Sequence, residues 1–241
     1  KPSQTGASMA IGGNDVSLLD MTSAYSTFAD KGIHVPPTSI LEITNNEGQP
    51  IYKYNEAHPQ GKRALQEDVS FLVSSILSDK TARYHEFSPG NPLELDRPAA
   101  AKTGTTDLFR DNWTMGYTPY LTVGTWAGNS DDTKMLDVIG ITGAAPMWHD
   151  IMEYASQRYH FPPDDFTKPA DVHAGTVSAI TGLLPRNGEP TVTDWFIDGT
   201  MPTMMSNYTN NPQKNCNKRR NCQQPGTGAG QIYPGPIIAG N

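Results

Sequence analysis

The sequence predicts an α+β fold in which helices pack on an antiparallel sheet. Residues 113–117 and 120–127 have the alternating pattern of strands, and Thr118-Pro119 supplies a turn between them. Residues 66–80 repeat apolar side chains at helical spacing. The expected buried face of this helix consists of Val69, Leu72, Val73, Ile76 and Leu77.

Two further helices and a hairpin complete the predicted elements. Residues 17–31 are expected to form a helix that begins with a capping box of Ser17 and Asp20 and stops at Gly32. Residues 39–54 predict a hairpin around the turn-forming tetrad Asn-Asn-Glu-Gly. Pro146 suits the first turn of the last helix. The expected buried face of that helix consists of Trp148, Ile151, Met152, Ala155 and Tyr159.

The composition of the chain changes after residue 160. Residues 1–160 are expected to form the main domain, with 161–205 as a Pro- and Thr-rich extension packed on it. Residues 206–241, dominated by Asn, Gln, Pro and Gly, predict a disordered tail. Cys216 and Cys222 in that tail indicate a small disulfide loop outside the cytoplasm. A zinc half-site is the weaker alternative, because no histidine lies nearby.

Composition excludes some classes of function. The 241 residues carry a formal net charge of −7, and the only block of like charges is the short run 218–220. Nucleic acid is therefore not expected as a partner, since binding a polyanion needs a basic face. No apolar run reaches the roughly 18 residues that span a membrane. With neither an initiator Met nor a signal peptide, the chain is expected to be a processed or excised piece.

The segment Lys102-Thr103-Gly104-Thr105 has the chemistry of a carboxylate-binding strand. The lysine supplies a positive charge and the two threonine hydroxyls can donate hydrogen bonds, with Thr106 beside them. Gly104 lets a ligand lie flat against the strand, because it has no Cβ. A backbone N–H just beyond the glycine can face a developing oxyanion. Taken alone, the three letters K-T-G also fit an ordinary strand edge with an exposed lysine.

Other candidate sites are weaker on the same residues. A phosphate-binding P-loop is excluded, because the glycines that it requires before the lysine are missing. His149 and Glu153 lie one helical turn apart and could be half of a metal site, but no second histidine is placed to help, so neither a metal nor a cofactor is expected. Trp113 and Tyr117 are expected in the core, whereas Trp126 could line a cleft or fill the core.

Four blocks of the sequence, in order, resemble the C-terminal half of the transpeptidase domain of class A (bifunctional) penicillin-binding proteins. The resemblance covers about residues 1–160, and the GLLP and DWFIDGTMP segments resemble an extension that some members carry. The fold that it implies is that of the serine DD-peptidases and β-lactamases, of which this chain would supply the C-terminal half. The blocks are AIGGNDVSLLDMTSAYSTFADKGI, VSFLVSSILSDKTAR, RPAAAKTGTTDLFRDNWTMGYTPYLTVGTWAGN and TGAAPMWHDIM.

The resemblance also implies roles for the motif. Lys102 and Thr105 match catalytic positions of the family's K-T-G-T element, while Thr103, Gly104 and Thr106 fall at substrate-binding positions. In that family the lysine and the threonines orient the substrate carboxylate. The backbone N–H of the residue matching Thr105 forms half of the oxyanion hole, and the N–H of a nucleophilic serine forms the other half.

The serine nucleophile is where this sequence departs from the family. No serine is followed by the spacing S-x-x-K, and there is no S-x-N. Tyr208-Thr209-Asn210 fits a looser Y-x-N, but it falls at the start of the expected tail, where chance explains it better. Both motifs precede the block at 10–33 in the family, so the chain is expected to begin after them and to be inactive by itself.

The implied parent is a serine D,D-transpeptidase on the extracytoplasmic face of the bacterial cytoplasmic membrane. Its expected partners are peptidoglycan stem peptides, β-lactams and the N-terminal half of the same domain, with the membrane reached only through an anchor that this chain lacks. Two alternatives stay open: a non-catalytic peptidoglycan-binding or scaffolding remnant of the same fold, and a fragment of a β-lactamase.

Overall fold

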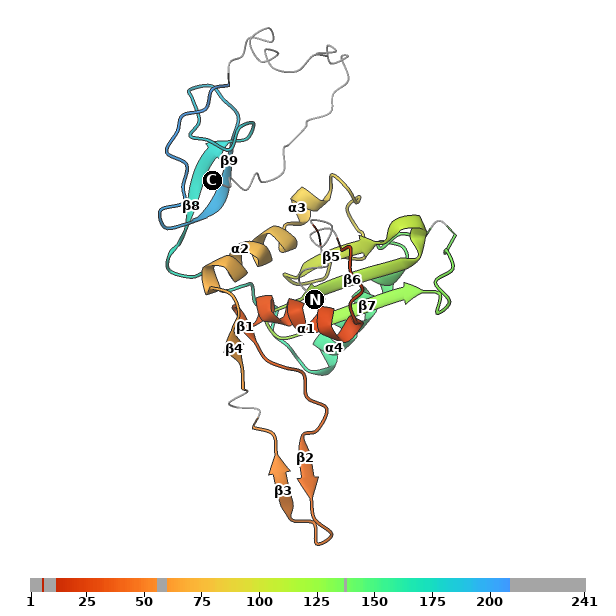
Figure 1. Cartoon of the computed structure of the whole chain (residues 1–241). Coiled ribbons are helices and arrows are strands. Elements are labelled where there is room, and N and C mark those ends of the chain that lie inside the picture. The colour runs from red at the N-terminus through yellow and green to blue at the C-terminus, as the bar shows by residue number, and fades with distance from the viewer. Residues whose placement is uncertain (1–5, 7–11, 56–59, 137, 209–241) are drawn as a thin grey trace. The chain divides into compact units, whose positions relative to one another are not determined.

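A computed structural model shows the fold of the chain (Figure 1) and describes residues 6, 12–55, 60–136 and 138–208. The chain divides into two compact units, Lys1–Lys168 and Pro169–Asn241. The first unit therefore extends past residue 160, where the sequence pattern changes.

A three-stranded antiparallel sheet is the centre of the first unit. Its order is β5-β6-β7, with β5 at Ala100–Thr105, β6 at Asp111–Tyr117 and β7 at Thr122–Gly128. The turn between β6 and β7 is closed by a 2.9 Å hydrogen bond from Thr118 N to Leu121 O. The two strands and the turn predicted for 113–127 are thus confirmed.

Helices cover both faces of this sheet. On one face, Thr22 of α1 (Leu18–Ala29) lies 3.8 Å from Met115 Sδ. On the other, Thr125 Oγ1 donates a 2.8 Å hydrogen bond to Ala144 O, at the start of α4 (Ala144–Arg158). Thr125 pairs with Thr114, the neighbour of Met115. Because successive side chains of a strand point to opposite faces, α1 and α4 lie on opposite sides. Figure 1 shows α1 in front of the sheet.

The main core of the unit lies between the sheet and α4. At its centre, Trp148 is fully buried and lies against Gly116 of β6, where an added Cβ would approach Trp148 Cζ2 to 2.4 Å. The indole can therefore occupy this place only because position 116 has no side chain. The buried residues of this cluster are Leu93, Leu95, Ala99, Ala101, Val123, Ala145, Trp148 and Met152.

The first helix forms as its local sequence predicts. Ser17 Oγ accepts a 3.1 Å hydrogen bond from Asp20 N, and its hydroxyl donates to the Asp20 carboxylate at 2.7 Å. The chain leaves the helix through Gly32, whose φ is +89° and whose missing Cβ would lie 2.2 Å from Leu65 O. Both the left-handed backbone and the close approach require glycine here.

The second predicted helix is present as α2 (Glu67–Ser78), but the face predicted to be buried is wrong. The buried residues are Ser70, Phe71 and Ser74. Val69 and Ile76 are 39% and 48% exposed, and the other three predicted core residues are only half-buried. The reason is a polar contact of the helix with the sheet, which the apolar pattern cannot show.

Tyr117 of β6 makes the polar contact with α2, and its side chain is completely buried, as predicted. Its hydroxyl lies 3.0 Å from Ser74 Oγ, which also donates to Ser70 O at 2.8 Å. Burial raises the pKa of the Tyr117 phenol, so this group stays neutral and can donate. Small serines let α2 approach a tyrosine that stands up from the sheet, against Tyr25 and Phe28 of α1.

The face predicted for the last helix is also partly wrong. Pro146 lies in the first turn of α4, and Trp148 and Met152 are buried as expected. Ile151 and Tyr159, however, are 46% and 64% exposed, while the buried positions also include Ala144, Ala145 and Ser156. The helix face that packs on the sheet therefore contains small residues as well as large ones.

Short elements connect these layers. The predicted hairpin of 39–54 is confirmed, with β2 (Glu42–Thr44) paired to β3 (Pro50–Lys53). β1 (Ile33–His34) pairs with β4 (Lys62–Arg63) between α1 and α2. α3 (Lys80–Arg83) follows α2, and the short 3-10 turn η3 (Asp107–Phe109) lies between β5 and β6.

The second unit contains a hairpin of β8 (Val172–Ser178) and β9 (Thr191–Ile197). The Glu189 carboxylate accepts hydrogen bonds from the hydroxyls of Ser178 and Ser206, both of which are buried. Described structure thus reaches Ser206, the first residue of the expected tail. Cys216 and Cys222, with their expected disulfide, lie outside the described residues. Within the described ranges, none of the helices is both long and apolar enough to cross a membrane.

The contact of Gly116 with Trp148 gives a first prediction. Gly116→Ala should lower the free energy of unfolding by about 1–3 kcal/mol, because the added methyl group overlaps the buried indole. Gly104→Ala in the neighbouring strand is the control, since its Cβ would come no closer than 3.6 Å to Trp113 Cβ. Urea unfolding of both variants measures the difference, and equal losses of stability would contradict the packing described for Trp148.

Candidate functional site

The Lys-Thr-Gly-Thr motif forms most of β5, and the register fixes which face each residue occupies. Lys102 pairs with Met115 of β6 and so belongs to the face covered by α1. Thr103 pairs with Thr114, on the face of α4. In the described part of the chain β5 pairs with β6 alone, which leaves its other edge free. The motif therefore lies on an edge strand, where an extended ligand could add as a further strand.

The backbone at the end of β5 points a donor towards that free edge. Thr106 N donates a 3.0 Å hydrogen bond to Asp111 O of β6. Because successive N–H groups of a strand point to opposite edges, the preceding N–H of Thr105 points away from β6. This places a backbone donor at the free edge, just beyond Gly104, while its role at an oxyanion stays a prediction.

Lys102 is exposed, with its ammonium 2.6 Å from the carbonyl oxygen of Thr103. That bond uses one of its three N–H donors, so the charge stays available to a ligand.

A loop behind β5 fixes the two threonines of the motif. Gly140 N donates a 3.0 Å hydrogen bond to Thr105 Oγ1, so the hydroxyl hydrogen of Thr105 can still be donated to a carboxylate. A Cβ on Gly140 would lie 2.7 Å from Thr103 Cβ. Asn112 of β6 holds the same loop through a 2.9 Å bond to Val138 O. Sequence reasoning treated Gly140 as part of a connecting loop only, and no pattern in the sequence links it to the motif.

Gly104 is not required by the packing of the protein. Its backbone lies outside the left-handed region, and an added Cβ would meet Trp113 Cβ at an ordinary 3.6 Å. The other glycines of the sheet differ in this respect, because a Cβ at 116, 124 or 128 would approach a neighbouring side chain to 2.4 Å or less. Packing therefore does not explain the glycine at position 104, and its role in ligand binding stays a prediction.

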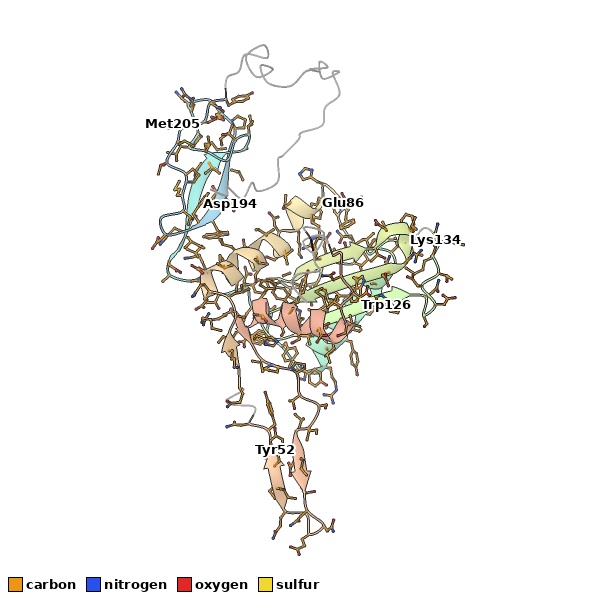
Figure 2. All side chains as sticks on the ribbon, viewed as in Figure 1. Tyr52, Glu86, Trp126, Lys134, Asp194 and Met205 are labelled. Carbon is orange, nitrogen blue, oxygen red and sulfur yellow. The ribbon has the colours of Figure 1, made fainter. Side chains whose placement is uncertain are left out.

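A polar network continues from the motif into the rest of the sheet. The Asp111 carboxylate accepts a 2.9 Å hydrogen bond from Thr106 Oγ1 and another of 2.9 Å from Trp126 Nε1. Trp126, labelled in Figure 2, is half-buried and lies over Gly128. Trp113, its cross-strand partner, is half-buried rather than fully in the core. The indole of Trp126 thus holds the carboxylate beside Thr106, a contact that the sequence did not predict.

The alternative sites have structural explanations. His149 Nδ1 lies 3.2 Å from Pro92 O, and Glu153 accepts a 3.1 Å hydrogen bond from Asp96 N, so both connect α4 to the segment before β5. Among the described residues no three His, Cys, Asp or Glu side chains are grouped as metal ligands. Tyr208 of the Y-x-N match is described, but the rest of that tripeptide is not.

Comparison with known proteins identifies the class to which this sheet and motif belong. Residues 2–153 match the penicillin binding protein transpeptidase domain family. Because the match extends over more than half of the sequence, the chain belongs to this family.

Individual relatives define the branch more closely. The chain is 30% identical over 204 residues to penicillin-binding protein 1A of Aquifex aeolicus (strain VF5), with 81% of this chain and 26% of that protein covered. It spans about a quarter of the length of the curated relatives that it matches. These relatives confirm the resemblance to class A penicillin-binding proteins.

Solved structures confirm the fold. Penicillin-binding protein 1A from Haemophilus influenzae has a TM-score of 0.71 at 24% identity, covering 86% of this chain and 36% of that chain. PonA1 from Mycobacterium tuberculosis, in complex with penicillin V, has a TM-score of 0.54 at 24% identity, with 68% and 43% covered. The fold predicted from the sequence, that of serine DD-peptidases and β-lactamases, is therefore correct.

The network at Asp111 gives a second prediction. Asp111→Ala should lower the free energy of unfolding by about 1–3 kcal/mol, since it leaves the donors of Thr106 and Trp126 without their acceptor. Hydrogen exchange of residues 106–111 should quicken at the same time. The control is Asp107→Ala, which removes a neighbouring exposed carboxylate. If both variants exchange alike, the carboxylate of Asp111 does not hold this end of β5.

Proposed function

We propose that this chain forms the substrate-binding side of a peptidoglycan D,D-transpeptidase that also binds penicillin. The observation that carries the proposal is the free edge of β5, which presents a cation, hydroxyl donors, a flat glycine and a backbone N–H in sequence. Membership of the transpeptidase family supports the same function. The penicillin V complex of the similar PonA1 supports β-lactam binding.

Every residue of the motif has a task in this proposal. Lys102 provides the positive charge that attracts the C-terminal carboxylate of a stem peptide, and the hydroxyls of Thr103 and Thr105 donate hydrogen bonds to it. Gly104 lets the peptide lie against the strand, and Thr106 supports the end of the strand through Asp111. The free N–H of Thr105 then faces the oxygen of the reacting carbonyl, where negative charge develops.

The reaction is acyl transfer through a serine ester. The serine oxygen attacks the carbonyl carbon of the D-Ala–D-Ala amide, and the C–N bond breaks as the serine proton passes to the leaving D-alanine amine. An amine of a second stem peptide then attacks the ester. A new amide forms, and the serine oxygen recovers a proton from that amine. The N–H of Thr105 stabilises the oxyanion in both steps.

The serine itself is proposed to come from the preceding half of the same domain, because the 241 residues contain no S-x-x-K. Exposed apolar side chains on α1 and α2 support this arrangement. Leu19, Val69 and Ile76 are 61%, 39% and 48% exposed, although apolar helix faces usually pack against a neighbour. We place the whole protein on the extracytoplasmic face of the cytoplasmic membrane, where its peptidoglycan substrate lies.

The absence of the nucleophile gives a third prediction. The 241-residue chain, incubated with a fluorescent penicillin, should form no covalent adduct on a denaturing gel. A labelled band near 26.2 kDa would show a nucleophile within this chain and contradict the proposed division of the site. Conversely, a full-length protein that also fails to label would favour the non-catalytic scaffolding alternative.

A fourth prediction concerns the motif in the full-length protein. Lys102→Ala and Thr105→Val should each slow acylation by penicillin roughly ten- to a hundredfold, which corresponds to the loss of about 1.5–3 kcal/mol from one charge-assisted contact. Stopped-flow measurement of the second-order acylation rate tests both.

Matched variants control for other effects of these changes. Thr105→Ser keeps the hydroxyl that accepts from Gly140 N and should retain most of the rate. Lys134→Ala removes a lysine of the loop after β7, labelled in Figure 2, and should acylate normally. Wild-type rates in Lys102→Ala and Thr105→Val would remove these residues from the site.

A further inference from the structure

A buried asparagine lies beside the last threonine of the Lys-Thr-Gly-Thr motif. Asn112 of β6 pairs with Thr105 of β5, so the two side chains are neighbours on the face of the sheet that α4 covers. Asn112 is completely buried. Its Nδ2 donates a 2.9 Å hydrogen bond to Val138 O, whereas its Oδ1 has no hydrogen-bond partner among the described residues. A buried acceptor without a partner costs free energy, so this asparagine needs an explanation beyond packing.

The bond from Asn112 holds a short loop, residues 138–143, which leads into α4. This loop lies very close to the sheet. A Cβ on Gly143 would meet Asn112 Oδ1 at 2.4 Å, and a Cβ on Gly140 would meet Thr103 Cβ at 2.7 Å. Both glycines therefore allow the backbone of the loop to approach the side chains of β5 and β6.

The same loop gives one hydrogen bond to the motif. Gly140 N donates to Thr105 Oγ1 at 3.0 Å. The loop is closed beside this point by the Thr142 hydroxyl, which accepts from Ile139 N at 3.2 Å and donates to Ile139 O at 3.1 Å. A threonine hydroxyl can donate once and can also accept. Because the N–H of Gly140 occupies an acceptor position of Thr105 Oγ1, the hydroxyl hydrogen is left for a group that accepts.

We infer that Asn112 is a positioning residue, which acts through the loop 138–143 to hold the Thr105 hydroxyl as a donor to the ligand. This inference rests on the proposed function and adds to it a residue that acts through Thr105 rather than on the ligand. The links are the bond from Asn112 to Val138 and the bond from Gly140 to Thr105. A hydroxyl that is oriented before binding does not have to be ordered by the ligand, so a looser loop weakens its contact.

A double-mutant cycle in the full-length protein tests the inference. Asn112→Leu keeps a side chain of similar volume and removes the donor to Val138 O. It should lower the second-order rate constant of acylation by benzylpenicillin about three- to tenfold. In the Thr105→Val background it should cause no further loss, because the hydroxyl that it positions is absent.

Stopped-flow measurement separates the dissociation constant of the initial complex from the rate constant of the acylation step. Asn112→Leu and Thr105→Val should alter the same one of these two constants, because both act through one hydroxyl. A change in the other constant would contradict the positioning role.

Two further variants control for the folding of the protein. Asn129→Leu is the matched control, since Asn129 Nδ2 also donates to a backbone carbonyl, that of Thr133, at 3.0 Å in the loop after β7. This variant should acylate at the wild-type rate. Thr142→Val, at an exposed position, loosens the loop 138–143 without changing the core. It should slow acylation, and its effect should also vanish in the Thr105→Val background, even if Asn112→Leu fails to fold.

The outcomes distinguish the inference from the proposed function. Losses from Asn112→Leu and Thr142→Val that are equal with and without the Thr105 hydroxyl would overturn the inference, and so would wild-type rates in both variants. If Thr105→Val itself reacts at the wild-type rate, the role of Thr105 in the proposed function fails and the inference fails with it. If Thr105→Val is slow and only the cycle is additive, the proposed function stands without the positioning role of Asn112.

Discussion

The motif depends on a strand, β5, that is held along one edge and on one face and is open along its other edge. Its backbone pairs with β6, and Gly140 fixes it from the face of α4 through the hydroxyl of Thr105. Nothing in the described structure pairs with its other edge. A strand fixed in this way presents its free N–H groups and side chains at set positions, so a ligand does not have to order them on binding.

The supports of this strand lie far apart in the sequence. The loop that carries Gly140 is positioned by Asn112 of β6 and by the start of α4, where Thr125 bonds to Ala144 O. The indole of Trp148 presses α4 against Gly116 of the middle strand. Packing between the sheet and α4 therefore reaches the threonines of the motif through a chain of direct contacts.

Sequence reasoning succeeded where the cause of a structure is local. The cap at Ser17, the exit at Gly32 and the turn at Thr118-Pro119 follow from a few adjacent residues, and all were predicted. The motif was also found, because the residues that give it its chemistry are consecutive in the sequence. The roles of its residues stay predictions.

What sequence reasoning missed depends on surfaces that meet only in the fold. The apolar stripe of α2 was expected to be buried, yet Ser70 and Ser74 face the sheet because the hydroxyl of Tyr117 lies there. The contact of Gly140 with the motif crosses 35 positions of sequence, and no periodicity reports it. Likewise, the position of the Trp126 indole depends on Asp111 of the neighbouring strand.

The open edge of β5 also has a consequence for solubility. An unpaired strand edge can join the edge of another copy, and such pairing is a common route to aggregation. Lys102 stands in the middle of this edge, where the lysines of two copies paired side by side would repel each other. The charge and the polar threonines therefore oppose edge-to-edge pairing as well as being candidate ligand groups, and replacing them with apolar residues would make this edge prone to aggregation.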